Sequence, residues 1–251
     1  MTDPFLTADG QPRTVRGITL AANAPRIAEL AGRIGFDTVW IDLEHGTASF
    51  SEVDMLCLAI EAGGAIPTVR IPDHERHHIL RTLESGARIV IVPMIDDAAA
   101  AREIVRHGKY PPLGERGFYS KSRGTDYGLD PLVETFERAN QRTHFFAQIE
   151  TLKARENVEE ICSVESLAGI FVGPGDLSTS LGKPAAFGDP EVIGAVAEII
   201  RKARAALKHA GILAAPGPLL DAALEAGADL IFVGNDIADL ATSWRRLIDA
   251  L

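Results

Sequence analysis

The chain has 251 residues, of which 46% are hydrophobic and 24% charged, a composition that supports a large buried core and excludes disorder. Its net charge of −10 at pH 7 opposes binding to nucleic acid or to an anionic membrane surface. The cysteines, Cys57 and Cys162, both lie in apolar helical patterns, which predicts reduced core thiols. Neither an export signal nor an apolar run long enough to span a membrane is visible. We therefore expect a cytoplasmic protein with neither nucleic-acid nor membrane partners.

Short runs rich in Val and Ile alternate with segments of helical periodicity along the whole chain, a pattern typical of repeated βα units. The predicted strands are Val15–Leu20, Thr38–Leu43, Ile66–Ile71, Arg88–Met94, His144–Ile149, Gly169–Val172, Ile212–Ala215 and Leu230–Val233. The predicted helices lie near Ala24–Ile34, Ser51–Ala62, His74–Ser85, Asp97–His107, Lys153–Cys162, Pro190–Ala210, Leu219–Ala226 and Ile237–Leu251.

Three of the joints between a helix and the next strand carry a glycine, at Gly35, Gly86 and Gly227. Glycine fits the left-handed position that ends a helix. Together with the eight strands and the length, these joints favour a (β/α)8 barrel over an open doubly wound sheet, with residues 1–251 forming one domain.

One long irregular stretch, Gly108–Leu129, contains two adjacent prolines and several charged residues. A loop of this length inside a compact domain is usually functional, and we expect it to reach the rim of the barrel.

Polar residues gather after the predicted strands, where the active sites of such barrels lie. Asp42, Glu44 and His45 lie at the end of the second strand, and Arg70 lies at the end of the third. The fifth strand ends in the stretch 148–150 (Gln-Ile-Glu), and the sixth is followed by 173–176 (Gly-Pro-Gly-Asp). The strand starts are much less polar, and this asymmetry predicts an active site.

Glu150 and Asp176 end neighbouring strands, so their carboxylates can converge at the mouth of the barrel. Two carboxylates with open positions suit a hard divalent cation such as Mg²⁺ or Mn²⁺. Alternatively, Glu150 stabilises the start of a helix through its dipole, and Asp176 caps the turn before Leu177.

Asp42 and His45 are three residues apart across a turn, a spacing that lets the carboxylate orient the imidazole for general base catalysis. A structural histidine is the alternative. Arg70 ends an apolar strand and needs an anion, which is either an internal carboxylate such as Asp42 or Glu44, or a substrate carboxylate. The backbone amides of Gly175 and Asp176 could bind the same anion.

Taken together, these motifs resemble the metal-dependent class II pyruvate aldolases of the 4-hydroxy-2-oxoheptanedioate aldolase family, also called hydroxy ketoacid aldolases. The matching stretches run in order across nearly the whole chain: Trp40–Gly46, Val69–Pro72, Val92–Met94, Lys109–Gly117, Gln148–Glu150 and Gly169–Ser178. The resemblance implies a (β/α)8 barrel assembled as a hexamer, a trimer of dimers that exchange their last helices.

The resemblance also implies roles for single residues. Glu150 and Asp176 would bind Mg²⁺, Mn²⁺ or Co²⁺ together with pyruvate, with no organic cofactor. Arg70 would hold the pyruvate or enolate oxygen. The substrate would lie near Gln148 and the Gly175 and Asp176 amides. Glu84 would reach the site of a neighbouring subunit.

His45, oriented by Asp42, would move the proton of the 4-hydroxyl group through a water molecule on the metal. The implied reaction is reversible cleavage of a 4-hydroxy-2-oxo acid to pyruvate and an aldehyde, with the enolate stabilised by the metal and Arg70.

Four other functions remain open. A Schiff-base aldolase needs a lysine inside the barrel, yet the lysines at 109, 121, 153, 183, 202 and 208 fall on predicted helices or loops. A phosphosugar-binding barrel would use Gly217 and Gly234, although Asp236 opposes an anion there. The others are a non-catalytic binding barrel and a citrate-lyase-like enzyme that cleaves a coenzyme A thioester.

Overall fold

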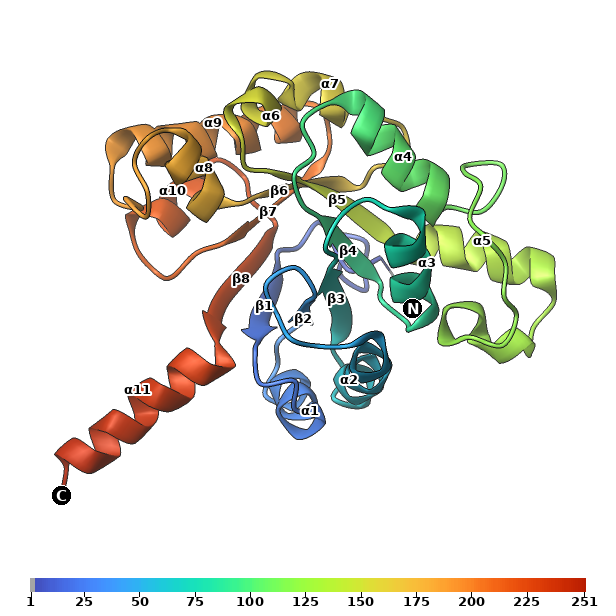
Figure 1. Ribbon diagram of the computed structural model, residues 1–251, viewed down its shortest axis with the longest axis horizontal. Helices are drawn as coiled ribbons and strands as arrows, with labels where there is room; N and C mark the ends of the chain where they lie inside the picture. Colours follow the sequence, from blue (N-terminus) through green and yellow to red (C-terminus); the bar gives the residue numbers. More distant parts are fainter. Residues whose placement is uncertain (1–2) are drawn as a thin grey trace.

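The computed structural model describes residues 3–251 and shows a closed barrel of parallel strands that pair in chain order, β8 closing onto β1 (Figure 1). The strands are β1 (Val15–Leu20), β2 (Thr38–Asp42), β3 (Ile66–Arg70), β4 (Ile89–Val92), β5 (His144–Ile149), β6 (Gly169–Val172), β7 (His209–Leu213) and β8 (Leu230–Asn235). The predicted (β/α)8 barrel is therefore confirmed.

Helices surround the barrel. They are α1 (Pro25–Arg33), α2 (Phe50–Ala62), α3 (Arg76–Glu84), α4 (Ala98–Gly108), α5 (Leu132–Arg142), α6 (Leu152–Glu156), α7 (Val158–Cys162), α8 (Pro174–Ser180), α9 (Pro190–Ala205), α10 (Pro218–Glu225) and α11 (Asp236–Asp249), with a 3-10 helix η1 (Arg123–Gly128). None of these helices, within residues 3–251, is long and apolar enough to cross a membrane.

The side chains of each strand alternate between the barrel interior and the surrounding helices. Trp40, Phe171 and Phe232 pack against one another inside the barrel, and Phe146 belongs to the same buried cluster. Valines, isoleucines and alanines at the alternate positions pack against the helices. Because the period is two, the polar residues that follow the inward-facing positions of β2, β3 and β5 also face inward, at the carboxyl ends of the strands.

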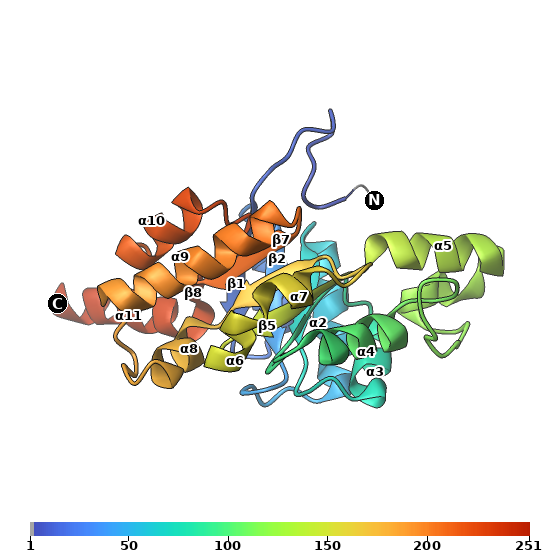
Figure 2. The ribbon, with the colours of Figure 1, turned by 90° about the horizontal axis from the view of Figure 1, so that it is seen from above.

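The opposite end of the barrel is closed by the N-terminal segment. Phe5 is 2% exposed and stacks on His209 with ring centroids 3.7 Å apart, while its edge contacts His144. Figure 2 shows this segment, in dark blue, at the end of the barrel opposite to α8. Access to the barrel interior is therefore from the carboxyl ends of the strands.

The three predicted glycine joints are confirmed, with φ of +106° at Gly35, +100° at Gly86 and +99° at Gly227. The boundary between α9 and β7 differs from the prediction. The helix ends at Ala205, and Leu207 takes the left-handed conformation (φ +59°) that a glycine usually provides. Strand β7 consequently begins at His209, three residues before its predicted start.

Helices α5 and α8 were not predicted from the sequence. The predicted helix Lys153–Cys162 is divided into α6 and α7. The long loop is also placed differently from the prediction. None of residues 108–129 lines the cavity at the barrel mouth. The stretch instead packs beside α3 and α5, because it follows a helix and so begins at the end of the barrel where the strands start.

The C-terminal helix α11 projects away from the barrel instead of covering it (Figure 1, red). Its start is anchored by Asp236, whose carboxylate accepts hydrogen bonds from the backbone of Ala21 (2.7 Å) and Ala22 (3.1 Å). Beyond that residue, Ile237, Trp244 and Ile248 are 50–71% exposed.

Candidate active site

A cavity of about 600 Å³ opens at the carboxyl ends of the strands. Its polar wall contains His45, Arg70, Gln148, Glu150 and Asp176, which come from four different stretches of the sequence. The remaining wall is formed by Trp40, Phe171, Gly173, Pro174, Gly175, Phe187, Gly188 and residues 213–219. All the residues expected to be catalytic or substrate-binding line this cavity except Asp42, which lies directly behind Arg70.

Glu150 is the most buried carboxylate of the site, with 1% of its surface exposed. The backbone N–H of Met94 donates to its Oε1 (2.7 Å), and the amide of Gln148 donates to its Oε2. Burial raises the pKa of Glu150, and the carboxylates of Glu44 and Asp176 raise it further. An additional positive charge at this position would therefore be favourable.

Met94 directs its N–H toward Glu150 because it adopts a left-handed backbone conformation, with φ of +55°. This conformation is uncommon for a residue with a side chain and occurs often at functional sites. Met94 lies in one of the stretches that carry the resemblance, but its role was not predicted, because nothing in a methionine indicates a positive φ.

Gly173 leaves the space that the buried carboxylate occupies. A Cβ atom built at this position would lie 2.7 Å from Oε2 of Glu150 and 3.2 Å from Nε2 of Gln148. A side chain at residue 173 would thus displace the carboxylate. Gly173 is required because only a glycine lets the backbone approach the Glu150 carboxylate this closely.

Arg70 forms an ion-pair network with two carboxylates. Its Nε and Nη2 lie 3.0 and 2.5 Å from the two carboxylate oxygens of Asp42, its direct neighbour across the parallel β2–β3 pair. Its Nη1 lies 3.0 Å from Oε2 of Glu44, but out of line for a hydrogen bond. Trp40 packs against the guanidinium, whose Cζ atom lies 5.1 Å from the centroid of the Trp40 ring. The internal carboxylate pairing considered for Arg70 is thus present, on the wall of the cavity.

These contacts shift the pKa values of Asp42 and Glu44 in opposite directions. Burial acts to raise the pKa of Asp42, but the hydrogen bonds and charge of Arg70 outweigh it and hold that pKa below its ordinary value. The pKa of Glu44 is raised, because burial exceeds the effect of Arg70 on this more weakly bound carboxylate.

The expected hydrogen bond between Asp42 and the His45 imidazole is not formed. Within residues 3–251, Oδ1 of Asp42 accepts the backbone N–H groups of Glu44 (3.0 Å) and His45 (3.3 Å), and the rest of the carboxylate is occupied by Arg70. Asp42 therefore fixes the turn that carries His45 and leaves the ring free. The imidazole is exposed on the cavity wall.

The donor set suits a divalent cation bound by few protein ligands. Within residues 3–251, no three His, Cys, Asp or Glu side chains converge on one metal position. Glu150 and Asp176 nevertheless share the cavity, and each raises the local negative potential. Mg²⁺ and Mn²⁺ commonly bind one or two carboxylates and complete their coordination with water or substrate oxygens. The residues present fit such an ion.

Other candidate residues lie outside this cavity. Glu84, at the end of α3, faces Tyr110 and Arg116 on the outside of the barrel, so one chain alone does not bring it to the site. No lysine among the described residues lines the cavity. Lys109, for example, is buried against the backbone carbonyls of Asn140 and Thr143.

The apolar part of the wall was also missed by the sequence analysis. Phe187, Leu213 and Leu219 line the cavity. In the sequence, Leu213 and Leu219 look like ordinary core residues, because only the closure of the barrel turns them toward the site.

Comparison with known proteins identifies the family. Residues 17–242 match the model of the family described as HpcH/HpaI aldolase/citrate lyase. The chain is 34% identical to the 2-keto-3-deoxy-L-rhamnonate aldolase of Klebsiella pneumoniae over 238 residues, which cover 94% of this chain and 88% of the relative.

Solved structures support the same family assignment. The HpcH/HpaI aldolase of Desulfitobacterium hafniense superposes with a TM-score of 0.89 at 30% identity, covering 95% of this chain and 92% of the other. The citrate synthase SbnG gives a TM-score of 0.85 at 28% identity, covering 95% and 93%. The chain therefore belongs to the HpcH/HpaI aldolase/citrate lyase family and is a carbon–carbon lyase of the class II pyruvate aldolase type.

Proposed function

We propose that this enzyme reversibly cleaves 4-hydroxy-2-oxo acids to pyruvate and an aldehyde, with a divalent metal ion as its cofactor and no organic cofactor. The observation that carries the proposal is one cavity that brings together the buried carboxylate of Glu150, the carboxylate of Asp176 and the guanidinium of Arg70. The relatives named as 2-keto-3-deoxy-L-rhamnonate aldolases support this substrate class, because such an acid carries its hydroxyl at C4.

Glu150 and Asp176 would hold the metal ion, with Mg²⁺, Mn²⁺ and Co²⁺ as the candidates. When bound, the ion supplies positive charge that stabilises the enolate oxygen. The hydrogen bonds from Met94 and Gln148 keep Glu150 in one orientation before any ligand enters. This preorganisation avoids a reorganisation cost during the reaction.

Arg70 would bind the oxygens of pyruvate. A guanidinium has five N–H groups, and hydrogen bonds to Asp42 use two of those of Arg70. Because Asp42 and Trp40 fix the plane of the group, the remaining N–H groups keep their direction. The backbone amides of Gly175 and Asp176, and the side chain of Gln148, lie at the same cavity and would contribute to substrate binding.

His45 would move the proton of the 4-hydroxyl group. Its ring is exposed to the cavity, and no hydrogen bond within the described chain restricts it. Removal of the hydroxyl proton drives cleavage of the bond between C3 and C4, which releases the aldehyde and leaves the enolate of pyruvate. The apolar wall of Phe187, Leu213 and Leu219 would shape the space for the aldehyde.

The test is pyruvate release from a panel of 4-hydroxy-2-oxo acids, with and without added metal, alongside cleavage of citryl and related coenzyme A thioesters. We expect pyruvate release that chelation abolishes and metal restores, with no thioester cleavage. Glu103→Gln, on an exposed side chain that does not line the cavity, is the control variant. Thioester cleavage without pyruvate release would favour the citrate-lyase-like alternative. A pyruvate adduct trapped by borohydride would contradict the mechanism.

We also propose that the enzyme works as a homo-oligomer, a hexamer built as a trimer of dimers that exchange α11. The helix leaves a groove on its own barrel, lined by Phe36 of the loop before β2, Leu224 of α10, and Ile231 and Val233 of β8. The exposed apolar residues of α11 match this groove in chemistry. In such an assembly Glu84 would reach a neighbouring site.

Light scattering during size-exclusion chromatography tests the assembly. The wild type should elute as a hexamer. Trp244→Glu, which places a charge on the apolar side of α11, should shift it to smaller species, whereas Arg245→Glu should have a weaker effect. A wild-type monomer with full activity would contradict the proposal.

A further inference from the structure

A second, much smaller cavity lies outside the barrel, between the end of α3, η1 and α5. Its volume is about 20 Å³, which is enough for one atom-sized or water-sized occupant. Four of its lining residues are arginines, Arg88, Arg116, Arg123 and Arg142, and Asp126 is its one carboxylate. It shares no lining residue with the catalytic cavity.

Buried N–H groups around this cavity lack partners. Within residues 3–251, Nε and Nη2 of Arg116 and Nε of Arg123 are buried and accepted by no oxygen. Arg116 is only 5% exposed, and its guanidinium stacks on the ring of Tyr110 at 4.5 Å. Burial lowers the pKa of Arg116, and the attraction of Tyr110 and Glu84 does not offset it. A buried charged donor without an acceptor is costly.

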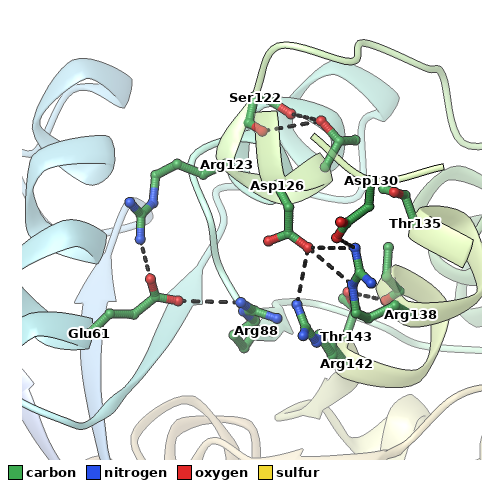
Figure 3. A network of polar contacts seen from close by, with 12 residues as sticks. Glu61, Arg88, Ser122, Arg123, Asp126, Asp130, Thr135, Arg138, Arg142 and Thr143 are labelled. Carbon is green, nitrogen blue, oxygen red and sulfur yellow. Dashed lines mark hydrogen bonds and ion pairs between the residues drawn. The ribbon is translucent and has the colours of Figure 1, made fainter. Parts of the chain in front are cut away.

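The neighbouring carboxylates are already shared among other arginines (Figure 3). Glu61 pairs with both Arg88 and Arg123. Asp126 pairs with Arg138 at 3.0 Å and with Arg142 at 3.3 Å.

Arg116 itself forms no ion pair within the described chain at 4 Å or less. Guanidinium groups therefore outnumber carboxylates in this cluster, although the whole protein carries a net charge of −10.

We propose that this cavity binds a single small inorganic anion of the halide class, such as chloride, through the free N–H groups of Arg116 and Arg123. The volume excludes phosphate, sulfate and organic acids. A water molecule would fit but would leave the excess positive charge uncompensated. The anion would connect η1 to the end of α3 and to α5, and so fasten the loop that contains η1.

Bromide identifies the occupant directly. Crystals of the full-length protein grown in sodium bromide should show an anomalous peak within hydrogen-bonding distance of Nε or Nη2 of Arg116 and of Nε of Arg123. A well-ordered cavity that shows only a water molecule, or no density, would overturn the proposal.

Thermal unfolding provides the test in solution. Replacing gluconate by chloride at constant ionic strength should raise the Tm of the wild type saturably, by about 2–4 °C once chloride reaches about five times its dissociation constant. Arg116→Gln should abolish this response. Arg138→Gln is the matched control, because Arg138 belongs to the same network but does not line the cavity.

The same chloride response in Arg116→Gln, or no response of the wild type up to molar chloride, would refute the site. If Arg116→Gln does not fold, Arg123→Gln takes its place in the same comparison, and the bromide peak decides independently of either variant.

Discussion

Replacement of Arg70 separates its structural role from its catalytic role. In the folded protein its side chain is 13% exposed, and it pairs with Asp42 and Glu44, whose side chains are 22% and 19% exposed. Arg70→Ala leaves these two acids close together without a cation. Breaking a fully buried pair costs about 3–5 kcal/mol. The partial exposure here reduces this to about 2–4 kcal/mol, or a fall in Tm of about 5–15 °C for a chain of this size.

Arg70→Ala should lower kcat by more than its loss of folded protein can explain. Loss of one preorganised donor to a developing oxyanion usually costs about 10²–10³ in kcat. We expect at least that loss for Arg70→Ala, measured on protein that is fully folded at the assay temperature. Arg70→Lys should recover part of the Tm but little of the rate, because an ammonium group cannot reproduce the planar fork.

Arg33→Met is the control for the general effect of removing an arginine. Arg33 pairs with Glu29 on the exposed face of α1, and its loss should change the free energy of unfolding by less than about 0.5 kcal/mol. The reasoning would be refuted if Arg70→Ala lost much of its Tm while its folded fraction kept a nearly normal kcat/KM. Arg70 would then serve only the internal ion pairs.

Three further changes test other parts of the site and fold. His45→Ala should lower aldol cleavage by about 10²–10⁴-fold with metal affinity, measured by calorimetry, nearly unchanged; a collapse of metal binding would make His45 a ligand. Gly173→Ala should displace the Glu150 carboxylate and weaken metal binding at least about tenfold, and an unchanged affinity would show that the close approach is unimportant. Burial lowers the pKa of His144 to about 4, so its contribution to stability is present above pH about 6.5 and is lost as the pH falls toward 4. On the order of 2–3 kcal/mol should disappear in urea titrations across that window, and His144→Gln should flatten the dependence; an equally steep dependence in this variant would contradict the assignment.

The sequence predicted the barrel well because its signals are local and repeated. A glycine at each of three helix ends and a period of two along the strands determine where the chain turns and which side chains point inward. These rules alone place Gln148 and Glu150 at the mouth of the barrel, where both line the cavity. The predicted α9–β7 boundary was wrong because Leu207 adopts a left-handed backbone conformation, which a leucine does not indicate in the sequence.

Contacts between distant stretches could not be predicted with the same certainty. Asp42 looked like a partner for the His45 ring, three residues away, but the strand register sets it beside Arg70, which competes for the same carboxylate. The apolar cavity wall and the projection of α11 likewise depend on how the barrel closes. Neither feature can be predicted from the local pattern of residues.

Exchange of the methyl hydrogens of pyruvate for deuterium, followed by proton NMR in heavy water, tests the central claim most directly, because it reports enolate formation without any aldehyde. The account predicts rapid exchange with wild-type enzyme and Mg²⁺ or Mn²⁺, and none after chelation or in the Glu150→Gln variant. Exchange that continues at the wild-type rate in the chelated enzyme or in Glu150→Gln would contradict it.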